Sequence, residues 1–381
     1  MPKQIGDYNK NQLLSVLRES GATSRVELSR LLDISAPAIT RNTARLIENG
    51  IVRECGAEES SIGRKPTLIE LCDDFCYVIG VDIVGDTLKV ALANFMGTTI
   101  LDFEEPACRQ DGADAVLKQL IDSLNKIISD SKVPKEKIWV ITIGTPGIFD
   151  SETGKSRLTF FLKDWDEIDI RLRVFEALGI ETIIENDVNL DVIGESWKSF
   201  DKEYESLFYV KLGQGFASKI VLQNKLLRGW NRLAGEIGYM LPSVPEGAVD
   251  AENYENQMCN DAVSKRYYEM NGKNEIKTIS DLCEFIAEGD DIAEKVMNEL
   301  LNRFAIALLN SVVVVDPQVI ILGGDACNFG EKEIGFLKQR MEQYFPSTYN
   351  IITSKLSKKS CLYGAIKTGL DYVEDRITNI W

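Results

Sequence analysis

Two short helical patterns joined by a tight turn constrain the fold of this chain more than any other feature. Ser24 is a good N-cap for the first pattern, and Glu27 three residues later completes a capping box. Asp33 and Ile34 form the turn, and Ser35 is expected to cap the second pattern. This spacing predicts a helix-turn-helix, whose second helix is the one that enters the major groove of DNA.

A β-hairpin is predicted directly after the second helix. Gly50 ends that helix as a C′ glycine. A strand follows, then a polar turn over 56–63 and a second strand over 67–71. A hairpin in this place is a wing, and Arg64 and Lys65 are expected to reach phosphate or a minor groove.

The second helix has one polar face. With Ile39, Leu46 and Ile47 facing inward, the residues left outward are polar or cationic. Arginine pairs well with guanine, and asparagine pairs well with adenine. We expect base contacts from this face, with Ser35 nearer the backbone: Thr40, Arg41, Asn42 and Arg45. The alternative is a small helical subdomain that binds protein, in which the arginines are only solvated.

The charge of the chain is unevenly distributed. The net charge is −16, but residues 1–70 carry +1 and the remainder carries −17. A near-neutral head on an acidic body indicates that affinity for DNA would come from a few cations at defined positions. It argues against a protein that coats DNA nonspecifically. The eight cysteines form no C-x-x-C pair, and no apolar run is long enough for a transmembrane helix. These features predict a cytoplasmic protein without a membrane partner.

Histidine is absent from the whole sequence. This absence excludes a Ser-His-Asp triad, a histidine general base and every metal site that uses histidine.

After residue 71 the pattern changes to strands that alternate with helices. The order β-β-β-α-β-α-β predicts one lobe of a ribonuclease-H-like, actin-like α/β fold. Its elements are expected at 76–83, 87–94, 98–103, 113–131, 138–144, 168–178 and 181–187. A second lobe is expected to contain strands at 207–213, 217–223, 319–324 and 351–353, and helices at 258–270, 278–287, 291–314 and 331–344.

The predicted domains are a winged helix-turn-helix over 1–71 and two actin-like lobes. The first lobe covers 72–190 together with a C-terminal helix at 363–381. The second lobe covers 191–362 and is expected to bind the effector and to form the oligomer contact.

Six short motifs occur in one order along the body. They are Gly80-Val-Asp-Ile, Gly144-Thr-Pro-Gly147, Glu185-Asn186-Asp187-Val-Asn189, Gly213-Gln-Gly215, Gly235-Glu236-Ile-Gly238 and Asp316-Pro-Gln-Val-Ile-Ile-Leu-Gly323-Gly324. Each motif is weak alone, but together they resemble the ROK family of repressors, open reading frames and sugar kinases. With the winged head, the chain is similar to the repressor branch, which includes N-acetylglucosamine- and xylose-type repressors.

The resemblance implies a sugar site in the body. An asparagine donates and accepts while an aspartate accepts, so Asn186 and Asp187 suit vicinal hydroxyl groups. In the family's kinases the equivalent of Asp187 is the general base. The implied sugar-binding residues are Asn186, Asp187, Glu236, Glu255 and Gly147. The alternative for Asn186 and Asp187 is that they only cap the next helix.

The phosphate loops depart from the family pattern. The kinases have D-x-G-G-T at the first loop, whereas here Val84 replaces a glycine and Asp86 replaces a hydroxyl residue. The second loop has Ala217 and Lys219 in glycine positions, and the turn before Asp325 is also altered. Phosphate loops need close backbone approach, so we expect no ATP binding.

The family's zinc site is also missing. Tyr239 replaces its histidine, and residues 243–257 contain no cysteine. A structural zinc site needs such ligands, so no zinc is expected, and Tyr239 is expected to pack in the core.

Together these patterns predict a sugar-responsive DNA-binding regulator that is not an enzyme. Its expected partners are operator DNA, a sugar or sugar derivative, and a second copy in a homodimer or dimer of dimers. One alternative is an ATP-dependent sugar kinase with an appended DNA-binding head, in which Asp187 remains the base. Another is a structural protein whose head binds protein and whose body only dimerises.

Overall fold

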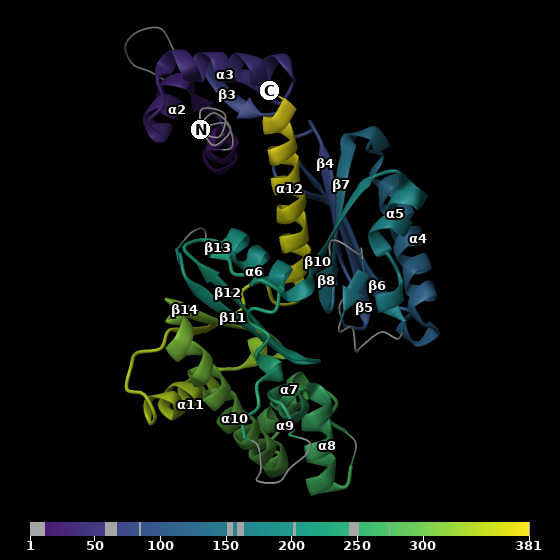
Figure 1. Cartoon of the computed structure of the whole chain (residues 1–381), viewed down its shortest axis with the longest axis vertical. Coiled ribbons are helices and arrows are strands. Elements are labelled where there is room, and N and C mark those ends of the chain that lie inside the picture. Colours follow the sequence, from purple (N-terminus) through teal and green to yellow (C-terminus); the bar gives the residue numbers. More distant parts are fainter. Residues whose placement is uncertain are drawn as a thin grey trace. The chain divides into compact units, whose positions relative to one another are not determined.

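The computed structural model describes residues 12–380 except 58–66, 84, 151–154, 158–163, 201–202, 244–250 and 274. The chain divides into two compact units, residues 1–185 with 365–381 and residues 186–364. Figure 1 labels their elements. The wing residues Arg64 and Lys65 lie outside the described residues, as does Val84 of the first phosphate loop.

The head of the first unit has the predicted winged-helix elements. A helix over 12–20 precedes α2 (Arg25–Leu32) and α3 (Ala36–Glu48). The head also contains a three-stranded antiparallel sheet in the order β1-β3-β2. Its strands are β1 (Thr23–Ser24), β2 (Val52–Ala57) and β3 (Thr67–Leu71).

Local signals at the helix ends are mostly confirmed. The Ser24 hydroxyl accepts a hydrogen bond from the Glu27 amide at 3.3 Å. Asp33 has a φ of 51° in the turn, and Gly50 has a φ of 70° after α3. Ser35 occupies the N-cap position of α3, but the predicted side-chain capping bond is wrong, because the described side chain makes none.

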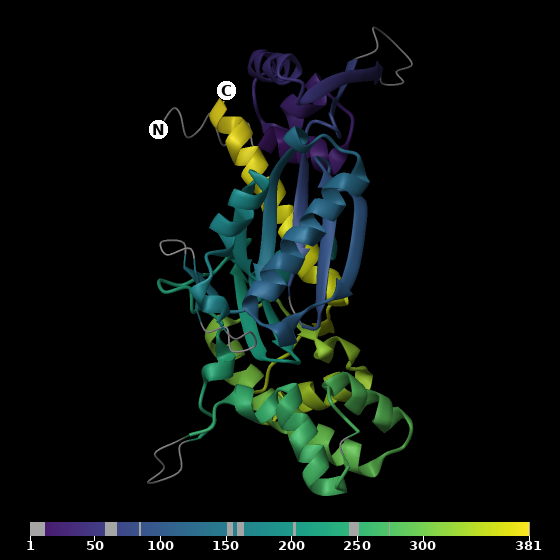
Figure 2. The ribbon, with the colours of Figure 1, turned by 90° about the vertical axis from the view of Figure 1, so that its right-hand side faces the viewer.

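The remainder of the first unit is a five-stranded sheet in the order β10-β7-β4-β5-β6. Helices α4 and α5 pack on one of its faces, as Figure 2 shows for α4. The residues of α12 that belong to this unit pack on the other face, where Gly369 lies against Val78 and Val140. The elements are β4 (Tyr77–Asp82), β5 (Thr87–Asn94), β6 (Thr99–Pro106), α4 (Ala113–Ser131), β7 (Ile138–Thr145), β8 (Ile148–Asp150), β9 (Lys155–Arg157), α5 (Ile170–Leu178), β10 (Glu181–Asn186) and α12 (Ser360–Ile380).

A buried arginine connects the head to this sheet within the first unit. Arg18 forms an ion pair with Glu374 of α12 and donates to the Phe95 carbonyl at 3.0 Å. Its guanidinium also lies over the Phe95 ring, 5.0 Å from the centroid. Burial lowers the pKa of Arg18 to about 10, so the side chain stays cationic at neutral pH.

The second unit is built on a five-stranded sheet in the order β13-β12-β11-β14-β15. Its main helical layer, α7 to α11, covers one face, and α6 covers the other. The elements are α6 (Asp187–Lys198), β11 (Leu207–Leu212), β12 (Phe216–Leu222), β13 (Lys225–Leu226), α7 (Tyr254–Met258), α8 (Asn260–Asn271), α9 (Ile279–Ala287), α10 (Asp291–Val315), β14 (Val319–Gly324), α11 (Glu331–Glu342) and β15 (Ile351–Thr353).

Strand β11 has two different faces. Phe208, Val210 and Leu212 pack in the core with α10, while Leu207 and Tyr209 pack toward α6. Alternation along a strand therefore places Lys211 on the α6 face, at the carboxyl end of the strand. This end of β11 is where polar groups gather.

Helix α10 is long and apolar enough, by composition, to cross a membrane. Residues along its length, from Ala293 to Val312, are nevertheless buried in the core of the second unit. It therefore behaves as the core helix of a globular unit.

Candidate DNA-binding face and sugar site

The outward face of α3 presents cationic and small side chains. Thr40, Arg41 and Arg45 are exposed, as is Ser35 before the helix. Asn42 is half-buried rather than exposed, so it lies nearer the edge of this face than we expected. The Thr40 hydroxyl donates to the Ala36 carbonyl at 2.9 Å, which leaves its lone pairs and methyl group for a partner.

The orientation of α3 is fixed by an arginine from α2. The Arg25 side chain donates to the Thr43 hydroxyl at 3.1 Å and pairs with Glu54 of β2 at 2.8 Å. Thr43, Ile39 and Leu46 are fully buried beneath the helix. The face with Arg41 and Arg45 is thus held by packing on its opposite side.

The proposed sugar residues Asn186 and Asp187 lie where β10 ends and α6 begins. Asn186 caps α6, because its Oδ1 accepts a hydrogen bond from the Asn189 amide at 3.0 Å. Its Nδ2 donates to Asp187 Oδ1 at 3.3 Å. The capping alternative is therefore correct for one atom of Asn186, while Asp187 has a different principal partner.

That partner is Lys211, which the sequence interpretation missed. Its Nζ lies 2.8 Å from Asp187 Oδ2 and 2.8 Å from Asp191 Oδ2. Burial by itself would lower the pKa of Lys211, but the two carboxylates outweigh it and raise that pKa well above its usual range. Lys211 is therefore cationic, and its ammonium group engages one oxygen of the Asp187 carboxylate.

A second lysine holds Glu236. Lys219 Nζ lies 2.6 Å from Glu236 Oε1 and 3.5 Å from the Ala234 carbonyl. The Lys219 side chain is only 3% exposed, and Glu236 provides this buried ammonium group with a partner of opposite charge. Gly235 is needed here, because a Cβ at its φ of 85° would run into the Ser218 carbonyl of β12.

Glu255 lies close to Glu236. One of its carboxylate oxygens accepts from the Phe216 amide at 3.3 Å. Burial raises the pKa of Glu255; the Phe216 amide lowers it, and the charge of Glu236 adds to the increase. Tyr239 is 42% exposed, and burial together with these two glutamates raises the pKa of its hydroxyl. The expected core packing of Tyr239 is therefore wrong, because the ring stays at the surface beside the two acids.

The second unit brings these residues to one patch. Lys211 lies opposite Ala217 in the β11–β12 register, and Lys219 is two residues further along β12. Such diagonal neighbours are about 7–8 Å apart on the same sheet face. Asn186, Asp187 and Glu236 therefore share this patch, and Glu255 adjoins it. Gly147 belongs to the first unit, in the turn between β7 and β8, with a φ of 85°.

Lysines compensate part of the charge of the patch. The site contains three carboxylates, which would repel a phosphate unless nearby cations compensated them. Lys211 and Lys219 are such cations, since they pair with Asp187 and Glu236. A spacing argument could have found Asp191, since it is four residues after Asp187 on one helix face.

Charged side chains lie at both phosphate loops. In the first loop, Asp82 is paired with Lys89 of the adjacent strand at 3.2 Å, and both side chains are buried. At the second loop, the Asp325 carboxylate accepts from Asn260 and Ser280, each at 2.8 Å. A Cβ at Gly213 would lie 3.0 Å from Asp325 Oδ2, so this carboxylate lies directly against the loop. An anionic nucleotide would meet that carboxylate.

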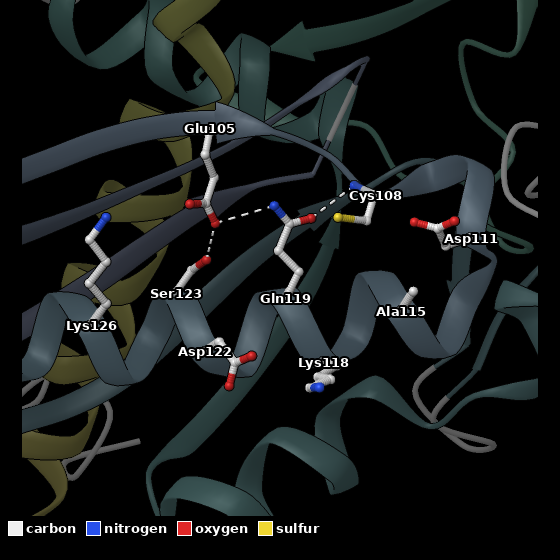
Figure 3. A pocket seen from close by; sticks show the side chains of 9 residues that line it. All are labelled: Glu105, Cys108, Asp111, Ala115, Lys118, Gln119, Asp122, Ser123 and Lys126. Carbon is white, nitrogen blue, oxygen red and sulfur yellow. Dashed lines mark hydrogen bonds between the residues drawn. The ribbon is translucent and has the colours of Figure 1, made fainter.

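In the part of the chain that the structure describes, no group of three His, Cys, Asp or Glu side chains could hold a metal ion. A surface hollow of the first unit lies between β6 and α4 (Figure 3). Its polar groups bond one another, since Glu105 accepts from Gln119 and Ser123. This hollow is not the sugar site.

The fold and the site define a class of protein, a winged helix-turn-helix joined to a body with the fold of sugar kinases. The model of the ROK family matches residues 78–369, and the chain belongs to this family. A winged helix-turn-helix DNA-binding model matches residues 7–53. Both matches confirm the predicted family and fold class.

Known proteins match the chain in two ways. A xylose repressor of Caldicellulosiruptor bescii is 29% identical, with 96% of this chain and 95% of the relative covered. A glucokinase of Thermotoga maritima is 24% identical, but covers 76% of this chain and 95% of its own length. A solved ROK family transcriptional regulator, a homologue of the E. coli MLC protein, has a TM-score of 0.80 and 19% identity over 99% of this chain and 98% of its own. The repressor and the regulator thus match nearly the whole chain, whereas the glucokinase match is shorter.

The buried charge of Glu255 predicts an effect on stability. Because its pKa is raised on folding, the ionised side chain costs stability at high pH, and this cost disappears as the pH falls through that raised pKa. Glu255→Gln keeps an acceptor for the Phe216 amide and should raise the melting temperature at about pH 8. The gain should shrink toward about pH 4, near the ordinary pKa of glutamate. Thermal denaturation across this range measures it, and a constant difference would contradict the assignment.

Proposed function

We propose that this protein is a cytoplasmic transcriptional repressor of carbohydrate genes, whose head binds operator DNA and whose body binds a sugar. The single observation that carries the proposal is the pairing of the kinase-type acid Asp187 with Lys211, in a chain that also has a DNA-binding head. The body keeps acceptors for hydroxyl groups but has lost a free base. The full-length match to a xylose repressor supports the same function.

A sugar kinase with an appended head is the alternative. Asp187 would have to take a proton from a sugar hydroxyl while an ammonium group lies 2.8 Å away. The Asp325 carboxylate also lies against Gly213 of the second phosphate loop, where an anionic nucleotide would meet it. These contacts favour binding without phosphoryl transfer.

The operator is proposed to be read by a homodimer or a dimer of dimers. Helix-turn-helix proteins bind half-sites about one helical turn, or a multiple of it, apart, so two heads are needed. Sugar and DNA affinity are then coupled if the sugar binds more tightly to one of two states. Helix α12 is suited to this coupling, since Ser360 at its start bonds Glu195 of α6 and Glu374 further along pairs with Arg18 of the head.

Arg41 is predicted to read a base. Selection from a random DNA pool should first define the operator. Arg41→Ala should then lose about 1–3 kcal/mol of discrimination at one position, the value of one good bidentate contact. Arg30→Ala removes the same charge from α2 and should leave the base preference unchanged. Titration of matched and mismatched duplexes measures both, and an unchanged preference in Arg41→Ala would contradict this docking.

The sugar half of the proposal is tested by calorimetry. Neutral sugars such as D-xylose, D-glucose and N-acetyl-D-glucosamine should be compared with their phosphates. A neutral sugar should bind more tightly, because both lysines are already paired with carboxylates. Asp187→Asn should weaken that binding by about 1.5–3 kcal/mol, the contribution of one charge-assisted hydrogen bond.

Operator binding without sugar should be unchanged in Asp187→Asn, and no ATP-dependent phosphorylation should be detected in the parent protein. Tighter binding of a sugar phosphate, or unchanged sugar affinity in Asp187→Asn, would contradict the proposal.

A further inference from the structure

We infer that Lys211 and Lys219 are positioning residues of the sugar site, each holding one sugar-facing carboxylate as a fixed, ionised acceptor. The inference rests on the proposed sugar site and adds two residues that it does not contain. It also explains why the same patch can bind hydroxyl groups without acting as a base.

Both lysines are poorly placed for any role at the surface. The Lys219 side chain is 3% exposed and the Lys211 side chain is 23% exposed. An unpaired ammonium group in such a position would destabilise the fold strongly. Their positions are explained only by the acids that they contact.

The contacts of each lysine restrict its acid. Lys211 pairs with Asp187 and Asp191, each at 2.8 Å. Asp191 lies one helical turn after Asp187 on α6. Lys219 contacts the Ala234 carbonyl as well as Glu236, so it ties that carboxylate to the backbone before Gly235. An acid fixed in this way loses little freedom when a hydroxyl group binds it.

Asp191 completes the balance of charge. The triad of Asp187, Lys211 and Asp191 carries one net negative charge, so one acceptor charge remains for the ligand. The pair of Lys219 and Glu236 is neutral. Hydroxyl groups can donate to these carboxylates, whereas an anionic substituent gains no free cation.

Loss of Lys211 would change how the patch titrates. The groups that face Lys211 are Asp187 and Asp191 from α6, Tyr209 from β11 and Cys361 from α12. Without the ammonium group, the two aspartates are like charges on one buried helix face. Such a pair takes up a shared proton as the pH falls. Sugar affinity should then depend on pH.

The test compares variants of the full-length chain by calorimetry from about pH 8 to about pH 5, with the neutral sugar of the panel that the parent binds best. Lys211→Met should lose about tenfold or more in affinity, the loss expected for one charged hydrogen bond, and lose more as the pH falls. Lys211→Arg keeps the charge and should retain the parent's pH profile. Lys219→Met should lose affinity by a similar factor through Glu236.

A charge-matched variant separates a loss of sugar affinity from a loss of the folded state. Lys211→Met combined with Asp191→Asn removes one charge of each sign and leaves Asp187 without its partner. It keeps the parent's net charge and should therefore melt at a higher temperature than Lys211→Met, yet bind sugar about tenfold more weakly than the parent, with affinity that falls at low pH. Lys332→Met breaks an exposed ion pair with Glu294 and should change neither quantity.

Two outcomes overturn the inference in different ways. If the parent binds no sugar of the panel, the proposed sugar site fails and the positioning role fails with it. If the parent binds sugar, and the charge-matched variant is folded with the parent's affinity and pH profile, only the positioning role is wrong.

Discussion

The ion pair of Lys211 with Asp187 and Asp191 is the interaction on which the character of the body depends. It places a cation in the buried layer between α6 and the β11–β12 strands. Removal of one partner would leave uncompensated charge in that layer, which typically costs about 3–5 kcal/mol. The same contact removes the free carboxylate that proton abstraction from a sugar requires. The same ion pair therefore stabilises the fold and engages the carboxylate that phosphoryl transfer to a sugar would use as its base.

The same kind of ion pair occurs at three places in the kinase-like body. Lys89, Lys211 and Lys219 each pair with an acid of a family motif, Asp82, Asp187 and Glu236. Each of these acids is therefore part of an internal ion pair. Acceptors for hydroxyl groups remain, and the Asp325 carboxylate lies against the second phosphate loop. A body of this kind is suited to detect a sugar and to leave it unchanged.

Local patterns were sufficient to predict much of the fold. The predicted bounds of β5 and α4 match those observed, because strong period-2 and period-3.6 patterns end at clear turn residues. Short elements such as α7 and β13 were missed, since they contain too few residues for a period to appear. Leu31 lies at helical spacing from the buried Leu28, yet it is 47% exposed, because spacing alone does not define which neighbours cover a short helix.

The lysine partners could not be predicted in the same way. Lys211 is 24 residues after Asp187, and Lys219 is 17 residues before Glu236, so only the register of β11 and β12 brings them together. The motifs indicated which acids matter, but the charge of the patch is a property of the folded sheet. For the same reason the half-burial of Asn42 became apparent only when α3 was packed against its neighbours.

The central claim is that sugar bound to the body changes the affinity of the head for DNA. Operator affinity of the full chain should be measured by fluorescence anisotropy at increasing concentrations of the sugar that binds in calorimetry. The account predicts a change of about 5- to 150-fold at saturation, with operator DNA changing the sugar affinity by the same factor. An operator affinity that stays constant at saturating sugar would contradict the account.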